Sequence, residues 1–163
     1  MSLWKQPATV EELNRMQSGS IASYLGIEFV DIGEDYLVAT LPVDERTRQP
    51  FGLLHGGASV VLSETMGSVG GFLAADPGSI VVGLEVNANH LRSATEGRVT
   101  GTCRSLHIGR TTQVWETRIH DAQERLISVS RLTVVVEPRR PAVSAPPQLQ
   151  GPAGLRECHR VPC

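Results

Sequence analysis

The chain of 163 residues lacks the features that mark membrane-spanning, secreted and zinc-binding proteins. It has no apolar run of about 18 residues, the length that crosses a bilayer, so no membrane span is predicted. The N-terminal sequence MSLWKQPATVEELNRM has no apolar core after a basic start, which argues against a signal peptide. The three cysteines, Cys103, Cys158 and Cys163, are odd in number and have no zinc-ligand spacing. We therefore expect free thiols, a cytoplasmic location, and no bound metal or redox cofactor.

The chain also lacks an excess of charge of either sign. Its 15 Lys and Arg residues against 17 Asp and Glu residues give a net charge of −2, so we expect no nucleic-acid partner. Apolar residues make up 40% and charged residues 20%, which is typical of a soluble globular protein. Because Cys103 stands in a strand-like run, we expect it in the core.

Patterns along the chain divide it into three parts. Residues 1–24 predict an N-terminal helical segment, because Thr9 and Glu12 have the spacing of a capping box. Residues 25–137 are expected to form the main domain. Residues 138–163 hold six of the 10 prolines and show no periodicity, which is typical of a loose C-terminal extension without a catalytic role.

The main domain is predicted to have an α+β fold. Alternating polarity predicts two strands within residues 26–43, and residues 56–75 predict a long helix whose only ionisable residue is Glu64. Four further strands, whose short links favour antiparallel hairpins or a meander, are predicted at residues 79–92, 97–107, 111–120 and 124–136.

The long helix is apolar on all sides, so we expect one antiparallel sheet to wrap around it. Its glycines each cost about 1 kcal/mol of helix propensity relative to alanine, which is reasonable where another backbone approaches closely. These glycines are Gly57, Gly67, Gly70 and Gly71. A sheet of this kind with open edges is expected to pair with a second protomer.

The start of the long helix has the features of an oxyanion site. Gly56 and Gly57 open the helix, so their N–H groups have no acceptor within it, and the helix dipole adds positive potential there. Such a site binds a developing negative charge, and the missing side chains allow a carbonyl to approach.

Glu64 is the second candidate feature. A carboxylate buried in an apolar helix costs several kcal/mol unless it is hydrogen-bonded, so Glu64 serves either function or structure. Ser68 lies four residues further on the same helix face, and Gln49 and His55 stand near the helix start. Three alternatives stay open: Glu64 faces the solvent or has a structural role, His55 orders the loop, and Gln49 is an exposed loop residue.

The stretch QPFGLLHGGASVVLSETMGSVG, which contains these residues, resembles the hotdog-fold acyl-CoA thioesterases. It is most similar to the branch of 4-hydroxybenzoyl-CoA thioesterases with a helix glutamate and of 1,4-dihydroxy-2-naphthoyl-CoA thioesterases. The segments VNANHLRSATEGRVTG and SLHIGRTTQVWET resemble the same branch. The resemblance implies a hotdog fold, sheets paired in a dimer or a dimer of dimers, and hydrolysis of an acyl- or aryl-CoA ester.

The same resemblance implies a role for each candidate residue. Glu64 matches the catalytic carboxylate, and Gly56 matches the backbone donor to the thioester carbonyl. Gln49 matches the side chain that orients the carbonyl or the nucleophile. His55 is expected near the thiol leaving group, and Ser68 is expected to position the carboxylate or water. In related enzymes the site lies across a dimer interface, so Gln49 and Gly56 would face the Glu64 and Ser68 of the other protomer.

Related enzymes also bind coenzyme A through segments that this chain contains. Cationic side chains suit the phosphates of the coenzyme, although each arginine is equally compatible with an ordinary solvated surface position. Gly83 matches a position beside the acyl or pantetheine chain. The residues that match the positions contacting the nucleotide part are His90, Leu91, Arg92, Ser93, His107, Ile108, Gly109, Arg110, Thr111 and Thr112.

Several alternatives stay open at this point. Glu64 acts either as a nucleophile or as a general base, and the sequence does not decide between the two. A hotdog dehydratase or hydratase, an acyl-CoA sensor and a dimeric scaffold are the competing functions. The spacing between the HGG motif and Glu64 favours a thioesterase, with small or bent aromatic acyl groups expected first and medium-chain acyl groups second.

Overall fold

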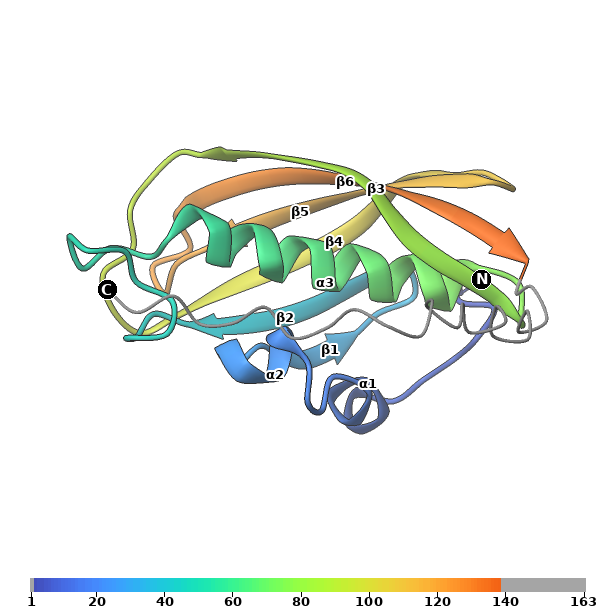
Figure 1. Ribbon diagram of the computed structural model, residues 1–163, viewed down its shortest axis with the longest axis horizontal. Coiled ribbons are helices and arrows are strands. Elements are labelled where there is room, and N and C mark those ends of the chain that lie inside the picture. The colour runs from blue at the N-terminus through green and yellow to red at the C-terminus, as the bar shows by residue number, and fades with distance from the viewer. Residues whose placement is uncertain (1, 139–163) are drawn as a thin grey trace, which may run out of the picture.

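The computed structural model describes residues 2–138, so the extension from residue 139, with Cys158 and Cys163, lies outside the described residues. Each predicted element is present, with bounds within two residues of those expected (Figure 1). The helices and strands are α1 (Val10–Met16), α2 (Ile21–Leu25), β1 (Glu28–Ile32), β2 (Tyr36–Pro42), α3 (Gly56–Ala74), β3 (Ser79–His90), β4 (Arg98–Ile108), β5 (Thr112–His120) and β6 (Leu126–Pro138).

The six strands form one antiparallel sheet in the order β1-β2-β4-β5-β6-β3. The predicted meander is confirmed for β4, β5 and β6, but the prediction is wrong for β3, which pairs with β6 instead of β4. The link between β3 and β4 crosses the helix start, where the Leu54 N–H donates to the Ala94 carbonyl at 2.8 Å. Because this link crosses over, β3 becomes an edge strand opposite β1.

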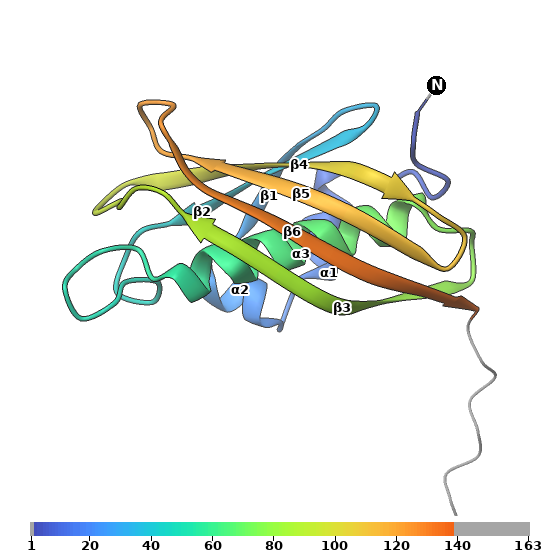
Figure 2. The ribbon, with the colours of Figure 1, turned by 90° about the horizontal axis from the view of Figure 1, so that it is seen from above.

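Helix α3 runs along one face of the curved sheet, as Figure 2 shows. The glycines of α3 allow other groups to approach the helix closely, as expected. The groups that approach are side chains, whereas we expected the backbone of another segment. A Cβ at Gly67 would stand 2.7 Å from Leu132, and one at Gly70 would stand 2.8 Å from Trp115. Large side chains of β5 and β6 therefore lie directly on the helix backbone.

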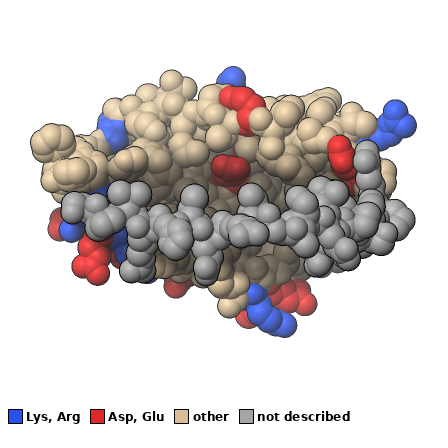
Figure 3. Space-filling model, in the orientation of Figure 1, with Lys and Arg blue, Asp and Glu red and all other residues tan. Residues whose placement is uncertain are grey.

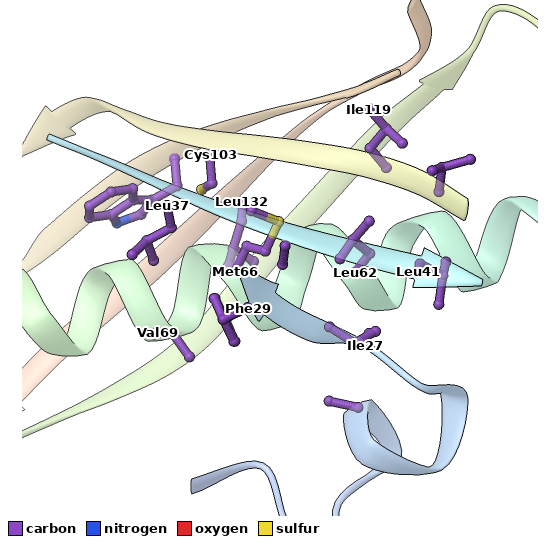
Figure 4. Close-up of a cluster of buried hydrophobic side chains, with 14 of the residues drawn as sticks. Ile27, Phe29, Leu37, Leu41, Leu62, Met66, Val69, Cys103, Ile119 and Leu132 are labelled. Atoms are coloured by element: carbon purple, nitrogen blue, oxygen red, sulfur yellow. The ribbon is translucent and has the colours of Figure 1, made fainter. Parts of the chain in front are cut away.

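Side chains of α3 and of the strands meet in the core (Figure 4). Leu62 and Met66 are fully buried against strand residues that include Phe29 and Leu37. Cys103 lies in this core, as expected, and burial raises the pKa of its thiol to about 12. A thiol in this position stays neutral and packs as a small apolar side chain.

The N-terminal segment is fastened to the domain at several points. The predicted capping box is present, since Thr9 Oγ1 accepts from the Glu12 N–H and the Glu12 carboxylate accepts from the Thr9 N–H. The side chain of Asn14 both donates to and accepts from the backbone of Phe29, at 2.9 and 2.8 Å. The ring of Trp4 stacks on Trp115 with the ring centroids 6.0 Å apart. Helix α1 is therefore held in a fixed position beside β1.

The open edges of the sheet are β1 and β3. Strand β3 is exposed along most of its length and carries the exposed apolar side chains Ile80, Val82 and Leu84. Pairing of this edge with a second protomer stays a prediction. Among residues 2–138, no helix combines the length and the apolar character needed to cross a membrane.

Candidate active site

The first turn of α3 leaves one backbone donor free. His55 is the N-cap, and its Nδ1 accepts from the Gly57 N–H at 2.8 Å. The His55 carbonyl accepts from the N–H groups of Ala58 and Ser59. The Gly56 N–H makes no hydrogen bond to any residue in the described range 2–138. Of the two glycines expected to bind an oxyanion, Gly56 is therefore the one whose donor remains available.

The ring of His90 lies against Gly56. A Cβ at position 56 would stand 2.6 Å from His90 Nε2, so a glycine is required for this contact. His90 Nδ1 is 3.3 Å from Ser128 Oγ, which fixes the orientation of the ring. The structure thus brings a residue that was expected to contact the coenzyme to the free donor at the helix start.

Gln49 lies near the same helix start, at the base of a tight loop. Its backbone N–H donates to the Leu53 carbonyl at 2.8 Å, and its side-chain oxygen accepts from the Phe51 N–H. Phe51, at the tip of this loop, is 88% exposed. The loop therefore fixes Gln49 and projects an aromatic ring away from the body of the protomer.

A pocket of about 370 Å³ joins these residues at the start of α3. Residues of the loop and of the end of β3 both line it. The pocket therefore contains some of the residues expected to be catalytic and some of those expected to bind the coenzyme. The lining residues are Gln49, Leu53, Leu54, Gly56, Ser59, His90, Leu91, Arg92, Ser93 and Ile127.

Glu64 is exposed in the protomer, so the expectation that it is buried is wrong. The sheet covers one side of α3, and Glu64 lies on a side that the sheet leaves open. Its carboxylate lies close to Gly83 of β3, since a Cβ there would stand 3.1 Å from Glu64 Oε1. Ser68 is half-buried in the same groove, and no hydrogen bond joins it to Glu64 within the described part of the chain.

The groove that contains Glu64 runs between α3 and the N-terminal helices and has a volume of about 490 Å³. Its lining residues are Met16, Gln17, Ile21, Val61, Glu64, Thr65, Ser68, Val69 and Phe72. Reasoning from the sequence missed Met16, Ile21 and Phe72. The one signal that pointed to them was their apolar character, Met16 and Ile21 in short helices and Phe72 in the long helix, and it carries no information about which helices meet.

Within one protomer, the two halves of the expected catalytic set stay apart. Gly56 and Glu64 are eight residues apart on α3, which corresponds to about 12 Å along the helix axis. Gln49, His55 and Gly56 therefore lie at one end of the helix, whereas Glu64 and Ser68 line the groove further along it.

The two expected coenzyme-binding segments are also separated. On β6, Ser128 pairs with His90, whereas Val135 pairs with Thr112, seven residues further along the strand. This separation is about 24 Å along an extended chain. The segments 90–93 and 107–112 thus lie towards opposite ends of the sheet in a single protomer. Within residues 2–138, no three His, Cys, Asp or Glu side chains are grouped in a way that would hold a metal ion.

Known proteins resemble this chain in sequence and in fold. The model of the thioesterase superfamily matches residues 51–128. A 1,4-dihydroxy-2-naphthoyl-CoA hydrolase of Escherichia coli is 55% identical over 134 residues, which cover 82% of this chain and 98% of the relative. The proofreading thioesterase EntH of Cronobacter turicensis is 49% identical over 134 residues, with the same shares of 82% and 98%.

A solved thioesterase of Haemophilus influenzae has a closely similar fold. It superposes with a TM-score of 0.84 at 48% identity, covering 86% of this chain and 98% of that one. The shared architecture is the sheet of six antiparallel strands around one long helix that the sequence led us to expect. The chain therefore belongs to the thioesterase superfamily, has its hotdog fold and is a thioester hydrolase.

Proposed function

We propose that the protein hydrolyses an acyl- or aryl-CoA ester to the free acid and coenzyme A. One observation carries the proposal: helix α3 has a free backbone donor at Gly56 and an exposed carboxylate at Glu64, which lies in an apolar groove. The names of the Escherichia coli and Cronobacter relatives, a CoA hydrolase and a thioesterase, agree with this reaction.

In this mechanism the thioester carbonyl binds at the start of α3. The Gly56 N–H and the helix dipole stabilise the negative charge that develops on the carbonyl oxygen. Glu64 then acts in one of two ways. It attacks the carbonyl carbon, so that the C–S bond breaks and a mixed anhydride forms that water hydrolyses, or it removes a proton from the attacking water.

Other side chains position the reacting groups. The departing thiolate takes up a proton, and the imidazole rings of His55 and His90 are nearest to the helix start where it leaves. Gln49 orients the carbonyl from the loop beside Gly56. Ser68, in the groove with Glu64, positions the carboxylate or the water.

We further propose that the active site is shared between two protomers. The distance of about 12 Å along α3 is too long for Gly56 and Glu64 of one chain to contact the same carbonyl. Two copies related by a two-fold axis bring the Gly56 of one helix to the Glu64 of the other. The exposed apolar edge β3 is the surface that such a pairing would cover.

The coenzyme would extend from the helix start over the surface of the assembly. Leu91, Arg92 and Ser93 border the pocket beside Gly56. Arg110, on the hairpin between β4 and β5, would come from another protomer, because this hairpin lies far from Arg92 within one chain. If two dimers associate into a tetramer, a protomer of the second dimer would supply Arg110.

A thiol-release assay over a panel of acyl- and aryl-CoA esters tests this function. We expect the wild-type protein to release coenzyme A and the Glu64→Gln variant to lose at least about 10³-fold in rate with its fold intact. Glu45→Gln is the matched control, because Glu45 is an exposed loop carboxylate. Near-wild-type turnover by Glu64→Gln would remove this residue from the mechanism.

A further inference from the structure

We propose that Met16, in the N-terminal helical segment, limits the length of the acyl group that the enzyme accepts. This inference rests on the proposed function, because it takes Glu64 as the residue that meets the thioester carbonyl. Met16 lies outside residues 51–128, the part of the chain that the superfamily model matches. The residue would therefore adjust specificity from the N-terminal helical segment.

The first argument is the chemical character of the groove beside Glu64. Its walls include the apolar side chains of Met16, Ile21, Val61, Val69 and Phe72. Within the described residues, Glu64 is its only charged lining group. Figure 3 shows the face of the protein on which α3 lies in Figure 1. Among the described residues visible there, uncharged ones occupy most of the central part. An acyl group attached to a carbonyl at Glu64 would enter this groove if it is apolar and uncharged.

The second argument is the position of Met16 and Phe72 between two cavities. Both side chains line the groove of about 490 Å³ that contains Glu64, and both also line a neighbouring pocket of about 510 Å³. That second pocket continues along the N-terminal segment past Pro7 and Ala8. Met16 and Phe72 are thus the partition at which an acyl group would have to stop.

The third argument is the length of the groove. Glu64 and Phe72 are eight residues apart on α3, or about 12 Å along the axis. This length suits a medium-length acyl chain or a single aromatic ring, whereas a long chain would have to pass the partition. Removing the Met16 side chain would join the two cavities and lengthen the available path.

The fourth argument is that the wall is fixed. Leu13, one turn before Met16, is fully buried, and the two hydrogen bonds between Asn14 and Phe29 hold the same helix to β1. A wall held in this way imposes a defined limit on length. Met16 itself is 53% exposed, so its replacement is not expected to disturb the core.

The experiment compares the kcat/KM values of full-length variants over straight-chain CoA esters from acetyl to palmitoyl. For Met16→Ala we expect the ratio of long-chain to medium-chain activity to rise about tenfold, because one or two methylenes in a pocket are worth this much. For Met16→Trp we expect the opposite change, a loss of about tenfold or more on medium chains with acetyl-CoA hydrolysis retained. Tyr24→Ala is the matched control, since Tyr24 is 71% exposed and lines neither cavity.

The outcomes separate this inference from the proposed function. Opposite shifts in the two Met16 variants, with Tyr24→Ala unchanged, support the inference. Chain-length profiles that are the same in all the proteins would overturn it while leaving the hydrolase function intact. A folded Met16→Trp protein that loses acetyl-CoA and medium-chain activity alike would also overturn it. A wild-type protein that releases thiol from no CoA ester would instead refute the proposed function.

Discussion

The carboxylate of Glu64 lies beside the backbone of Gly83, so that a Cβ at position 83 would stand 3.1 Å from Glu64 Oε1. The contact joins the long helix to the edge strand β3. A separation of this size is shorter than ordinary van der Waals contact, and an added methyl group would displace the carboxylate by a few tenths of an ångström. Gly83 is therefore a positioning residue for Glu64 in the mechanism proposed above.

The first prediction is that Gly83→Ala lowers kcat about tenfold with a small change in KM. Small displacements of a catalytic group reduce the rate strongly, and the carboxylate has some room to adjust. A double-mutant cycle with Glu64→Gln provides the control, because the second substitution should add no further loss if Gly83 acts through Glu64. Additive losses would mean that Gly83 acts elsewhere.

The local elements could be predicted from the sequence because their signals are local. The Thr9 and Glu12 capping box, the polarity alternation and the turn residues all act within a few positions, and the bounds they gave were accurate. The strand order was not predictable in full. The partner of β3 depends on the crossover link of residues 91–97. The predicted strands left only residues 93–96 between them, a length that suits a hairpin, so the predicted length did not reveal the crossover.

The candidate site was also only partly predictable. The free donor at Gly56 follows from its position at the start of a helix. The exposure of Glu64 did not follow, because an apolar helix gives no sign of which side the sheet leaves uncovered. The groove wall formed by Met16 depends on where the N-terminal helices dock. No pattern within those helices specifies that contact, and the pairing of Asn14 with Phe29 is visible only in three dimensions.

The second prediction is that two inactive variants restore activity when they assemble together. Gln49→Ala and Glu64→Gln each damage a different half of the proposed shared site. In a mixed dimer one site carries both defects and the other carries neither. After mixing in equal amounts, unfolding and refolding, about a quarter of the wild-type rate should return. Each variant refolded alone is the control, and a mixture no more active than their average would argue for a site within one chain.

The third prediction concerns the dependence of stability on alkaline pH. Burial raises the pKa of the Cys103 thiol from 9.0 to about 12, so the folded state holds this proton more tightly than the unfolded chain does. The contribution is fully present below the unfolded pKa and is lost as the pH rises towards the folded pKa. Between these values the free energy of unfolding should fall by about 1.4 kcal/mol per pH unit from this group.

Cys103→Ala provides the comparison for this prediction. The variant should show a smaller loss of unfolding free energy between about pH 9 and about pH 11, measured by urea denaturation. Other groups that titrate in this range are the same in both proteins, so they cancel in the difference. Parallel curves for the two proteins would show that the thiol titrates normally.

The fourth prediction is that Arg92 and Arg110 bind the coenzyme and not the acyl group. Arg92 borders the pocket at Gly56, and its guanidinium also donates to the Leu126 carbonyl at 2.8 Å, which orients it. Arg110 is exposed on the hairpin between β4 and β5. A charge-assisted bond to phosphate contributes about 1.5 to 3 kcal/mol, so replacing either arginine by alanine should raise KM by about tenfold to a hundredfold. The value of kcat should change little, because binding common to the ground state and the transition state is lost.

The decisive comparison for these two arginines uses the same acyl group on a short thiol that lacks the nucleotide. The Arg92→Ala and Arg110→Ala variants should match the wild-type protein on this substrate, because it has no phosphate for the arginines to bind. Arg104→Ala is the matched control, since Arg104 belongs to neither segment, lies over the Tyr36 ring and pairs with Asp35. A global loss of stability would impair both substrates alike and would be visible as a lower Tm. Equal losses on the two thioesters in folded variants would show that the coenzyme binds elsewhere on the protein.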